Sequence, residues 1–433
     1  MSPRVAAIAF AAVLAAAAPA PAQDRLTDLE RKIDALSHEV ERLKLGEAAE
    51  PTAEAAAPGQ APAATKVYRS AERKVSIGGY GEMTLQHFAR RNQMGDTAGK
   101  RDELDFARAV LYAGYKFNDW VLFNSELEFE HGSTGKGRGE VSVEQAYLDF
   151  TPWGRALGLR AGLLIVPVGL VNEVHEPTTF HGVLRPAVER NLIPTTWREN
   201  GAGVFGQAGP VSYRSYVVTG LQATSNAGVT GIGGSTPLRN GRSSGAKSFA
   251  EDAAWVSRVD VSPIDGVLAG GSLYIGEMDH NFTAAAVPLT LWDLHAQLEY
   301  RGAELKWLYT EGTIGNPDSV NTANGIARTA ATTTGVGRKL FGGYVEGAYN
   351  VLALCPRSKG QYLASFLRYE RYDTQAEVPA GWFADPANSR VEYTAGLTYK
   401  PIPQVAVKGD YQWLQNQARK GVNQLNLGVG YIF

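Results

Sequence analysis

The stretch NQLNLGVGYIF, residues 423–433, carries an apolar or aromatic side chain at every second position from Leu425 to Phe433. Polar or small residues occupy most of the positions between them. Strict alternation of this kind is typical of a β-strand with one apolar face. The last residues of most domains fray unless they are tied down. We therefore expect this strand to be paired along its whole length, with an apolar face that continues to Phe433.

Fifteen stretches before it alternate in the same way. Each is close to the length of about 9–11 residues that a tilted membrane-spanning strand requires. Tyr and Trp cluster near the ends of these stretches, as they do at membrane interfaces. The sixteen predicted strands are 75–88, 105–117, 120–131, 141–150, 157–168, 199–208, 211–220, 253–262, 267–276, 289–300, 303–312, 340–352, 361–372, 390–400, 404–414 and 423–433.

Short and long connections alternate between the predicted strands. The short ones are 117–119, 151–156, 208–210, 262–266, 300–303, 355–360 and 400–404, and the long ones are 89–104, 132–140, 169–198, 221–252, 277–288, 313–339, 373–389 and 415–422. Bacterial outer-membrane barrels have this parity, with short periplasmic turns and long outer loops. A sheet can span hydrocarbon only if it closes, because every backbone group must be paired. We predict an all-β transmembrane fold, a 16-stranded antiparallel barrel in a bacterial outer membrane.

The composition agrees with this fold and argues against some functions. The chain has 433 residues and a formal net charge of −2, so no general attraction to nucleic acid is expected. It contains 19 Tyr, 8 Trp and 48 Gly, which suits strands with one wet face and one apolar face. The single Cys355 cannot form a disulfide within the chain.

The first 73 residues fall into three patterns. Residues 1–22 combine Arg4, an apolar run and small residues at positions 20 and 22, which predicts a signal peptide rather than a membrane anchor. Residues 23–45 predict a periplasmic coiled coil, and 46–73 are an Ala/Pro-rich linker before the barrel of 74–433. The predicted coiled-coil contacts are Leu26, Leu29, Ile33, Leu36, Val40 and Leu43.

The heptad pattern predicts a homo-oligomer, although one amphipathic helix lying on the protein's own body is an alternative. Ile and Val at the a positions with Leu at d nominally favour two strands. Three heptads are marginally stable alone. We therefore expect contacts between barrels to decide the number of subunits.

A barrel of sixteen strands is wide enough for an aqueous channel. We therefore predict passive diffusion of small hydrophilic solutes across the outer membrane, without a cofactor. The connection 169–198 is stiffened by three prolines and is rich in charge, so we expect it to enter the lumen as a constriction. Packing on the outer rim or on a neighbouring subunit is the alternative. The predicted constriction and pore-lining residues are His175, Glu176, His181, Arg185, Glu189, Arg190 and Arg198, together with Arg108, Arg160, Arg214, Arg258, Lys306 and Arg368 on the wall.

The predicted wall carries both signs of charge. The acidic residues Glu126, Glu128 and Glu130 alternate along one strand, and similar numbers of basic residues lie on others. Many of these charges are expected to pair across neighbouring strands. The connection 221–252, rich in Gly, Ser, Thr and Asn, is predicted to be a mobile outer loop.

Several segments resemble the phosphate-selective porin O and P superfamily. They are GGYGE (78–82), LDFARAVLYAGYKF (104–117), VEQAYLDF (143–150) and LRAGLLIVPVGLVNEVHEP (159–177). The resemblance implies a trimeric outer-membrane porin, and carboxylate-selective porins with an N-terminal coiled coil look similar. The aromatic ending with Tyr431 and Phe433 also resembles the recognition signal of outer-membrane barrels for their assembly machinery. The mixed wall charge departs from the arginine ladder that phosphate selectivity requires in that superfamily.

Two other functions are alternatives to the channel. The barrel could be an anchor that tethers the membrane to the cell wall or a partner through the coiled coil. An enzyme is not expected, because HEPTTFH (175–181) spaces its histidines six residues apart rather than four. No metal site is predicted from the sequence.

Overall fold

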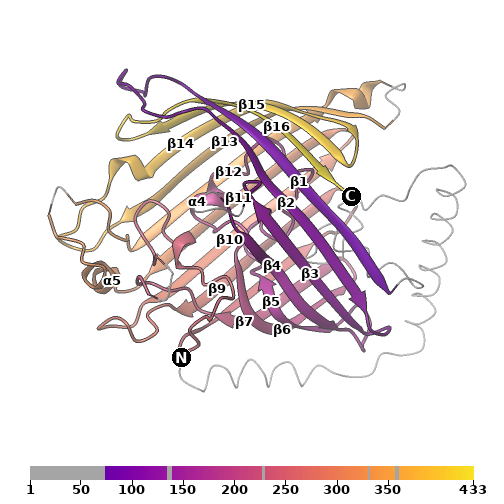
Figure 1. The fold of residues 1–433 in the computed structure, drawn as a ribbon, viewed down its shortest axis with the longest axis horizontal. Helices are drawn as coiled ribbons and strands as arrows, with labels where there is room; N and C mark the ends of the chain where they lie inside the picture. The colour runs from indigo at the N-terminus through magenta and orange to yellow at the C-terminus, as the bar shows by residue number, and fades with distance from the viewer. Residues whose placement is uncertain (1–73, 134–138, 227–229, 330–331, 356–359) are drawn as a thin grey trace, which may run out of the picture. The chain divides into compact units, whose positions relative to one another are not determined.

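Residues that alternate between apolar and polar build the wall of a closed barrel. The computed structural model describes residues 74–133, 139–226, 230–329, 332–355 and 360–433. This part of the chain contains sixteen strands (Figure 1). They are β1 (Val75–Phe88), β2 (Glu103–Lys116), β3 (Val121–Glu130), β4 (Val141–Phe150), β5 (Gly158–Ile165), β6 (Arg198–Ala208), β7 (Val211–Thr219), β8 (Ala253–Val261), β9 (Val267–Glu277), β10 (Pro288–Tyr300), β11 (Ala303–Ile314), β12 (Lys339–Asn350), β13 (Tyr362–Glu377), β14 (Ser389–Ile402), β15 (Val405–Asn416) and β16 (Gln424–Ile432).

Each strand pairs antiparallel with its neighbours in the sequence, and β16 pairs with β1 to close the ring. The closing register places Gly81 opposite Tyr431 and His87 opposite Leu425. The predicted 16-stranded antiparallel barrel is therefore confirmed. The predicted signal peptide, coiled coil and linker lie outside the described residues.

The two faces of the wall follow the predicted alternation. On β10, Leu294 and Leu298 are half exposed on the outside, whereas Asp293 and His295 are buried inside. On β2, Leu111 is exposed and its neighbour Tyr112 is buried. An apolar outer face is what lipid requires, because no water is available there to solvate polar side chains.

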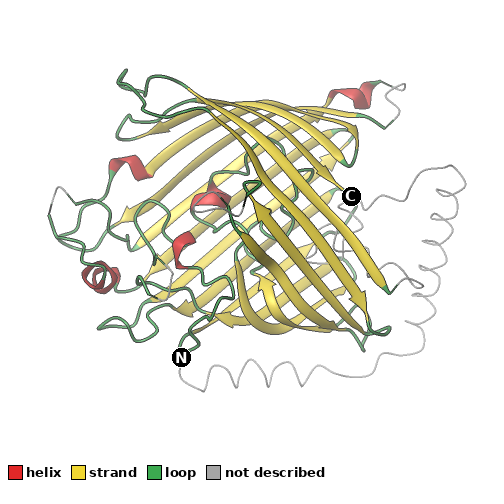
Figure 2. Cartoon of the chain, viewed as in Figure 1, coloured by secondary structure: helices red, strands yellow, loops and turns green. Residues whose placement is uncertain are grey.

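Short turns lie at one end of the barrel and longer loops at the other, which is toward the left in Figure 2. The loops contain short helical turns. These are α4 (Val188–Asn191), η2 (Arg239–Gly241), α5 (Pro317–Ala323) and η4 (Pro386–Asn388), while η3 (Val351–Leu354) follows β12 at the opposite end. Among the described residues, no helix combines the length and the apolar character needed to cross a membrane.

Candidate functional site

The connection between β5 and β6 lies against the inner wall of the barrel. Every residue of 169–198 is buried or partly buried, and none is exposed. Its short helix α4 appears within the ring of strands in Figure 1, and the backbone N–H of Val188 donates to Glu370 on β13 at 3.0 Å. The segment therefore has inner-wall contacts rather than only contacts at the outer rim.

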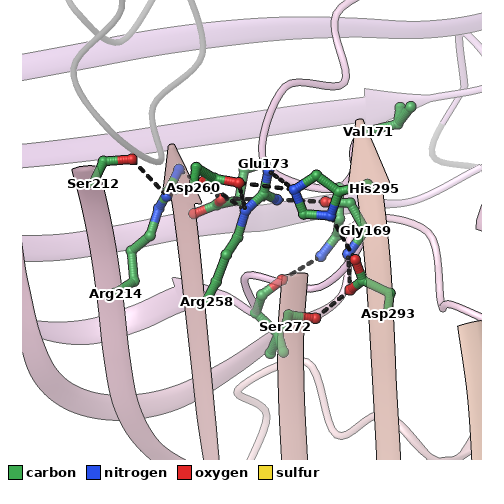
Figure 3. A network of polar contacts seen from close by, with 12 residues as sticks. Gly169, Val171, Glu173, Ser212, Arg214, Arg258, Asp260, Ser272, Asp293 and His295 are labelled. Atoms are coloured by element: carbon green, nitrogen blue, oxygen red, sulfur yellow. Dashed lines mark hydrogen bonds and ion pairs between the residues drawn. The ribbon is translucent and has the colours of Figure 1, made fainter. Parts of the chain in front are cut away.

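One end of the segment is held by a network of charges from β7, β8 and β10 (Figure 3). A single carboxylate oxygen of Glu173 lies 3.1 Å from Arg214 and 3.4 Å from Arg258. Both arginines also bind Asp260, at 2.6 and 2.9 Å. Each buried guanidinium is thus neutralised by carboxylates from the wall and from the segment, which removes much of the desolvation penalty.

The same network binds the backbone at the start of the segment. His295 links two aspartates, with Nε2 2.8 Å from Asp260 and Nδ1 2.6 Å from Asp293. Asp293 accepts the backbone N–H of Gly169 at 3.0 Å, and Arg258 donates to the carbonyl oxygen of the same residue. Wall charges therefore serve as anchors for the chain.

A second stretch of the wall, from β11 to β15, anchors the middle of the segment in the same manner. Asp410 on β15 accepts the backbone N–H of Val183 at 2.6 Å. Arg368 on β13 donates to the carbonyl oxygen of Leu184 at 3.3 Å. Two lysines also bind the backbone of the segment. Lys408 donates to the carbonyl oxygen of Phe180 at 2.7 Å, and Lys306 donates to that of Thr179 at 3.3 Å.

An apolar cluster completes the attachment. Leu192, Ile193 and Trp197 are fully buried and belong to one cluster with inward-facing residues such as Leu291 and Tyr274. The ring centroids of Trp197 and Tyr274 are 4.8 Å apart. This cluster was not predicted from the sequence, because the inner faces were expected to be charged. The alternating leucines before Asp293 on β10 were the available signal.

The predicted wall cations are paired with carboxylates or with carbonyl groups. Arg108 lies 2.8 Å from Glu82, Arg160 lies 2.7 Å from Asp149, and Arg368 lies 2.9 Å from Glu346. Such buried pairs contribute little net field to the lumen, because each positive charge has a negative one beside it.

Three arginines of the segment have no such ion pair with a carboxylate. An ion pair requires a distance of 4.0 Å or less between nitrogen and oxygen atoms. No carboxylate of the described residues lies that close to the guanidinium group of Arg185, Arg190 or Arg198. Arg185 donates instead to Thr196 and to a backbone carbonyl, and Arg198 donates to Ser142. Burial, with repulsion from Arg108, lowers the pKa of Arg185 to about 10. The Nε atoms of all three are buried without a hydrogen-bond partner in the described structure.

Two further arginines join them from the connection 221–252, for which the sequence predicts a mobile outer loop. Arg242 donates to the carbonyl oxygen of Thr195, and burial with repulsion from Arg239 lowers its pKa to about 10. Burial and repulsion from Arg190 lower the pKa of Arg239 as well. Buried Leu221 and Leu238 pack this connection into the apolar cluster. We call Arg185, Arg190, Arg198, Arg239 and Arg242 the arginine cluster.

The remaining predicted residues lie at separate places. His181 binds Glu304 on β11 at 3.0 Å, whereas His175 faces β3 and β4. Glu176 is buried near Glu126. Glu189 accepts the hydroxyl of Tyr344 at 2.7 Å, and burial raises its pKa. The two histidines of HEPTTFH therefore do not form a joint site.

The chain is similar to an uncharacterized protein of Aquifex aeolicus (strain VF5), with 36% identity over 357 residues, which cover 82% of this chain and 78% of that protein. No family model matches. Among solved structures, Salmonella typhi OmpF in complex with daunomycin and the outer-membrane channel DcaP of Acinetobacter baumannii each have a TM-score of 0.54 at 13% identity, covering 83% of this chain and 97% of theirs. The anion-selective porin from Comamonas acidovorans has a TM-score of 0.53 at 14% identity, covering 83% and 99%.

At these identities the solved structures establish the fold alone. It is the 16-stranded fold of outer-membrane porins. This fold agrees with the predicted location in a bacterial outer membrane.

Proposed function

This chain belongs to the same family as the uncharacterized Aquifex aeolicus protein, and we propose that it is an outer-membrane channel for passive diffusion of small hydrophilic solutes. The segment 169–198 forms the constriction of this channel. Small anions such as phosphate or carboxylates pass preferentially. The porin fold and the charged interior of the barrel support the proposal.

We attribute the anion preference to the arginine cluster, whose members form no ion pair within 4.0 Å among the described residues. Wall cations such as Arg160 and Arg368 are neutralised by adjacent carboxylates. The arginine cluster combines five positive charges from two connections. Burial lowers the pKa of Arg239 and Arg242, and repulsion from other members of the cluster lowers it further. An anion entering this region relieves that repulsion, so selectivity arises from local charge rather than from net charge.

Planar-bilayer recordings of the purified full-length protein test this function. Open conductance steps are expected, and the reversal potential across a KCl gradient should have the sign of chloride preference. Replacing chloride by phosphate or by a dicarboxylate then ranks the solutes. A reversal potential of the opposite sign would overturn the anion preference while leaving the channel intact.

A membrane anchor is the second candidate. The extensive burial of 169–198 and the apolar cluster around Trp197 favour it, because both reduce the open cross-section of the lumen. A correctly folded barrel that shows no conductance in the bilayer would support the anchor and contradict the channel.

We also propose that three barrels associate and that the family is a branch of the phosphate-selective porin O and P superfamily. Apolar side chains exposed on the outer face, such as Leu111 and Leu367, offer area for such contacts as well as for lipid. Native mass spectrometry in mild detergent should report three chains per particle. Monomers at all detergent concentrations would contradict the trimer.

A further inference from the structure

Three side chains with metal-ligating chemistry converge inside the barrel from separate elements. They are Glu126 on β3, Glu144 on β4 and His175 in the segment 169–198. One donor atom of each lies within 4.8 Å of the donor atoms of the other two. All three residues are buried, with 2%, 0% and 2% of their surface exposed.

The distances within this group are those of ligands that share an ion. His175 Nε2 lies 3.4 Å from Glu144 Oε2 and 3.8 Å from Glu126 Oε1. A charge-assisted N–H···O hydrogen bond is shorter, about 2.7–2.9 Å. A tetrahedral ion with bonds of about 2.0–2.1 Å separates its ligands by roughly 3.3 Å. The contact between His175 and Glu144 is a long hydrogen bond, and both spacings also fit ligands that share one ion.

Each of the three groups is oriented by a second contact. His175 Nδ1 lies 3.0 Å from the carbonyl oxygen of Asn172, to which it donates, so the Nε2 lone pair faces the carboxylates. Gln145 Nε2 donates to Glu126 Oε2 at 2.6 Å, and the hydroxyl of Tyr80 donates to Glu144 Oε2 at 3.1 Å. Outer contacts of this type fix the tautomer and rotamer of metal ligands.

The two carboxylates of the group have no direct ion pair with a basic residue. No Lys or Arg of the described residues lies within 4.0 Å, the limit for an ion pair, of the carboxylate of Glu126 or Glu144. Arg108 and Arg198 act on Glu144 only from beyond ion-pair distance. Arg108 binds Glu82 and Glu128 instead, and Arg198 donates to Ser142. Glu144 Oε1 is buried and has no hydrogen-bond partner in the described structure.

We propose that Glu126, Glu144 and His175 bind one divalent transition-metal ion, best matched by Zn²⁺, and that this ion fastens the segment 169–198 to β3 and β4. Its two positive charges balance the two carboxylates. One imidazole and two carboxylates leave a fourth position for water, a ligand set that Zn²⁺ accepts. The inference extends beyond solute passage, since it concerns how the segment is held.

Metal binding to the full-length protein in detergent tests the proposal. After treatment with EDTA and its removal, the folded protein is titrated with Co²⁺ by visible absorption and with Zn²⁺ by elemental analysis after gel filtration. One ion per chain is expected. The substitutions His175→Gln and Glu144→Gln should abolish this stoichiometric binding, and Gln145→Ala, which keeps all three ligands, should weaken it by about tenfold.

His131→Gln is the matched control, because this histidine lies just beyond β3 and binds Asp105 at 2.7 Å instead. Its Zn²⁺ affinity should equal that of the wild type. Wild-type protein that binds no Co²⁺ or Zn²⁺, or a folded His175→Gln variant that binds as the wild type does, would overturn the site. If the ligand variants do not fold, the wild-type titration and Gln145→Ala still decide. No channel recording enters this test, so it can succeed or fail independently of the proposed function.

Discussion

Phe433 and Gly79 exchange two backbone hydrogen bonds, with Phe433 N 2.9 Å from Gly79 O and Gly79 N 3.1 Å from Phe433 O. These bonds lie at the seam between β16 and β1. The aromatic ring covers the glycine, because a Cβ added to Gly79 would lie 2.8 Å from the Phe433 ring. Gly81 has the same relationship to the ring of Tyr431. The glycines of the first strand thus leave room for the aromatic side chains of the last.

Removing Phe433 should impair barrel closure. The deletion leaves the N–H and carbonyl groups of Gly79 without partners at the seam, where each unpaired backbone group costs roughly 1–3 kcal/mol. The folded fraction is measured by heat-modifiable mobility after assembly in cells. Leu354→Ala, an exposed apolar residue far from the seam, is the control. Normal assembly of the deletion variant would contradict the role of this strand in closure.

Gly79→Ala should destabilise the barrel by about 1–3 kcal/mol, because the new methyl group collides with the Phe433 ring and with the backbone of Val110. The matched control is Gly347→Ala on β12, where an added Cβ meets no atom within 4 Å. Urea unfolding in lipid vesicles compares the two variants. Equal stability would show that the seam has room for a side chain.

Neutralising Arg185, Arg190 and Arg198 to Gln together should shift the channel toward cations by several-fold in permeability ratio. The three guanidinium groups lack carboxylate partners among the described residues, so their removal changes the local field directly. Reversal potentials in a KCl gradient measure the effect. Arg155→Gln, in the short turn between β4 and β5, is the control. An unchanged ratio would remove these side chains from the permeation path.

Glu173→Gln should loosen the attachment of the segment 169–198. The substitution leaves Arg214 and Arg258 buried beside Asp260 alone, and breaking a buried ion pair costs about 3–5 kcal/mol. Urea unfolding and the current noise of single channels should both report the change. Glu103→Gln, which alters an exposed carboxylate on β2, should have neither effect.

Deleting residues 24–45 should weaken the oligomer only modestly. Three heptads are marginal by themselves, and contacts between barrels are expected to dominate. Native mass spectrometry of the deletion variant should still show the oligomer in gentle detergent. Complete conversion to monomers would assign the association to the predicted coiled coil.

Contacts between side chains inside the barrel could not be predicted from the sequence. Alternation placed Asp293, Arg214 and Arg258 on the inner face correctly, yet it could not reveal that Glu173 joins the two arginines. Nor could it bring His175 to Glu126 and Glu144, because these residues are distant in the chain. Pairing across a lumen depends on the path of a connection, and periodicity carries no information about that path.

The sequence alone determined the number of strands, their order and which side chains face lipid. Lipid supplies neither hydrogen bonds nor solvation for charge, so every second residue of a spanning strand must be apolar. This alternation is visible in the local sequence. Only the tertiary structure decided which wall charges anchor the segment 169–198 and which arginines lack a carboxylate beside them. These outcomes depend on distances of a few ångströms between segments far apart in the chain, where a buried charge must find its partner.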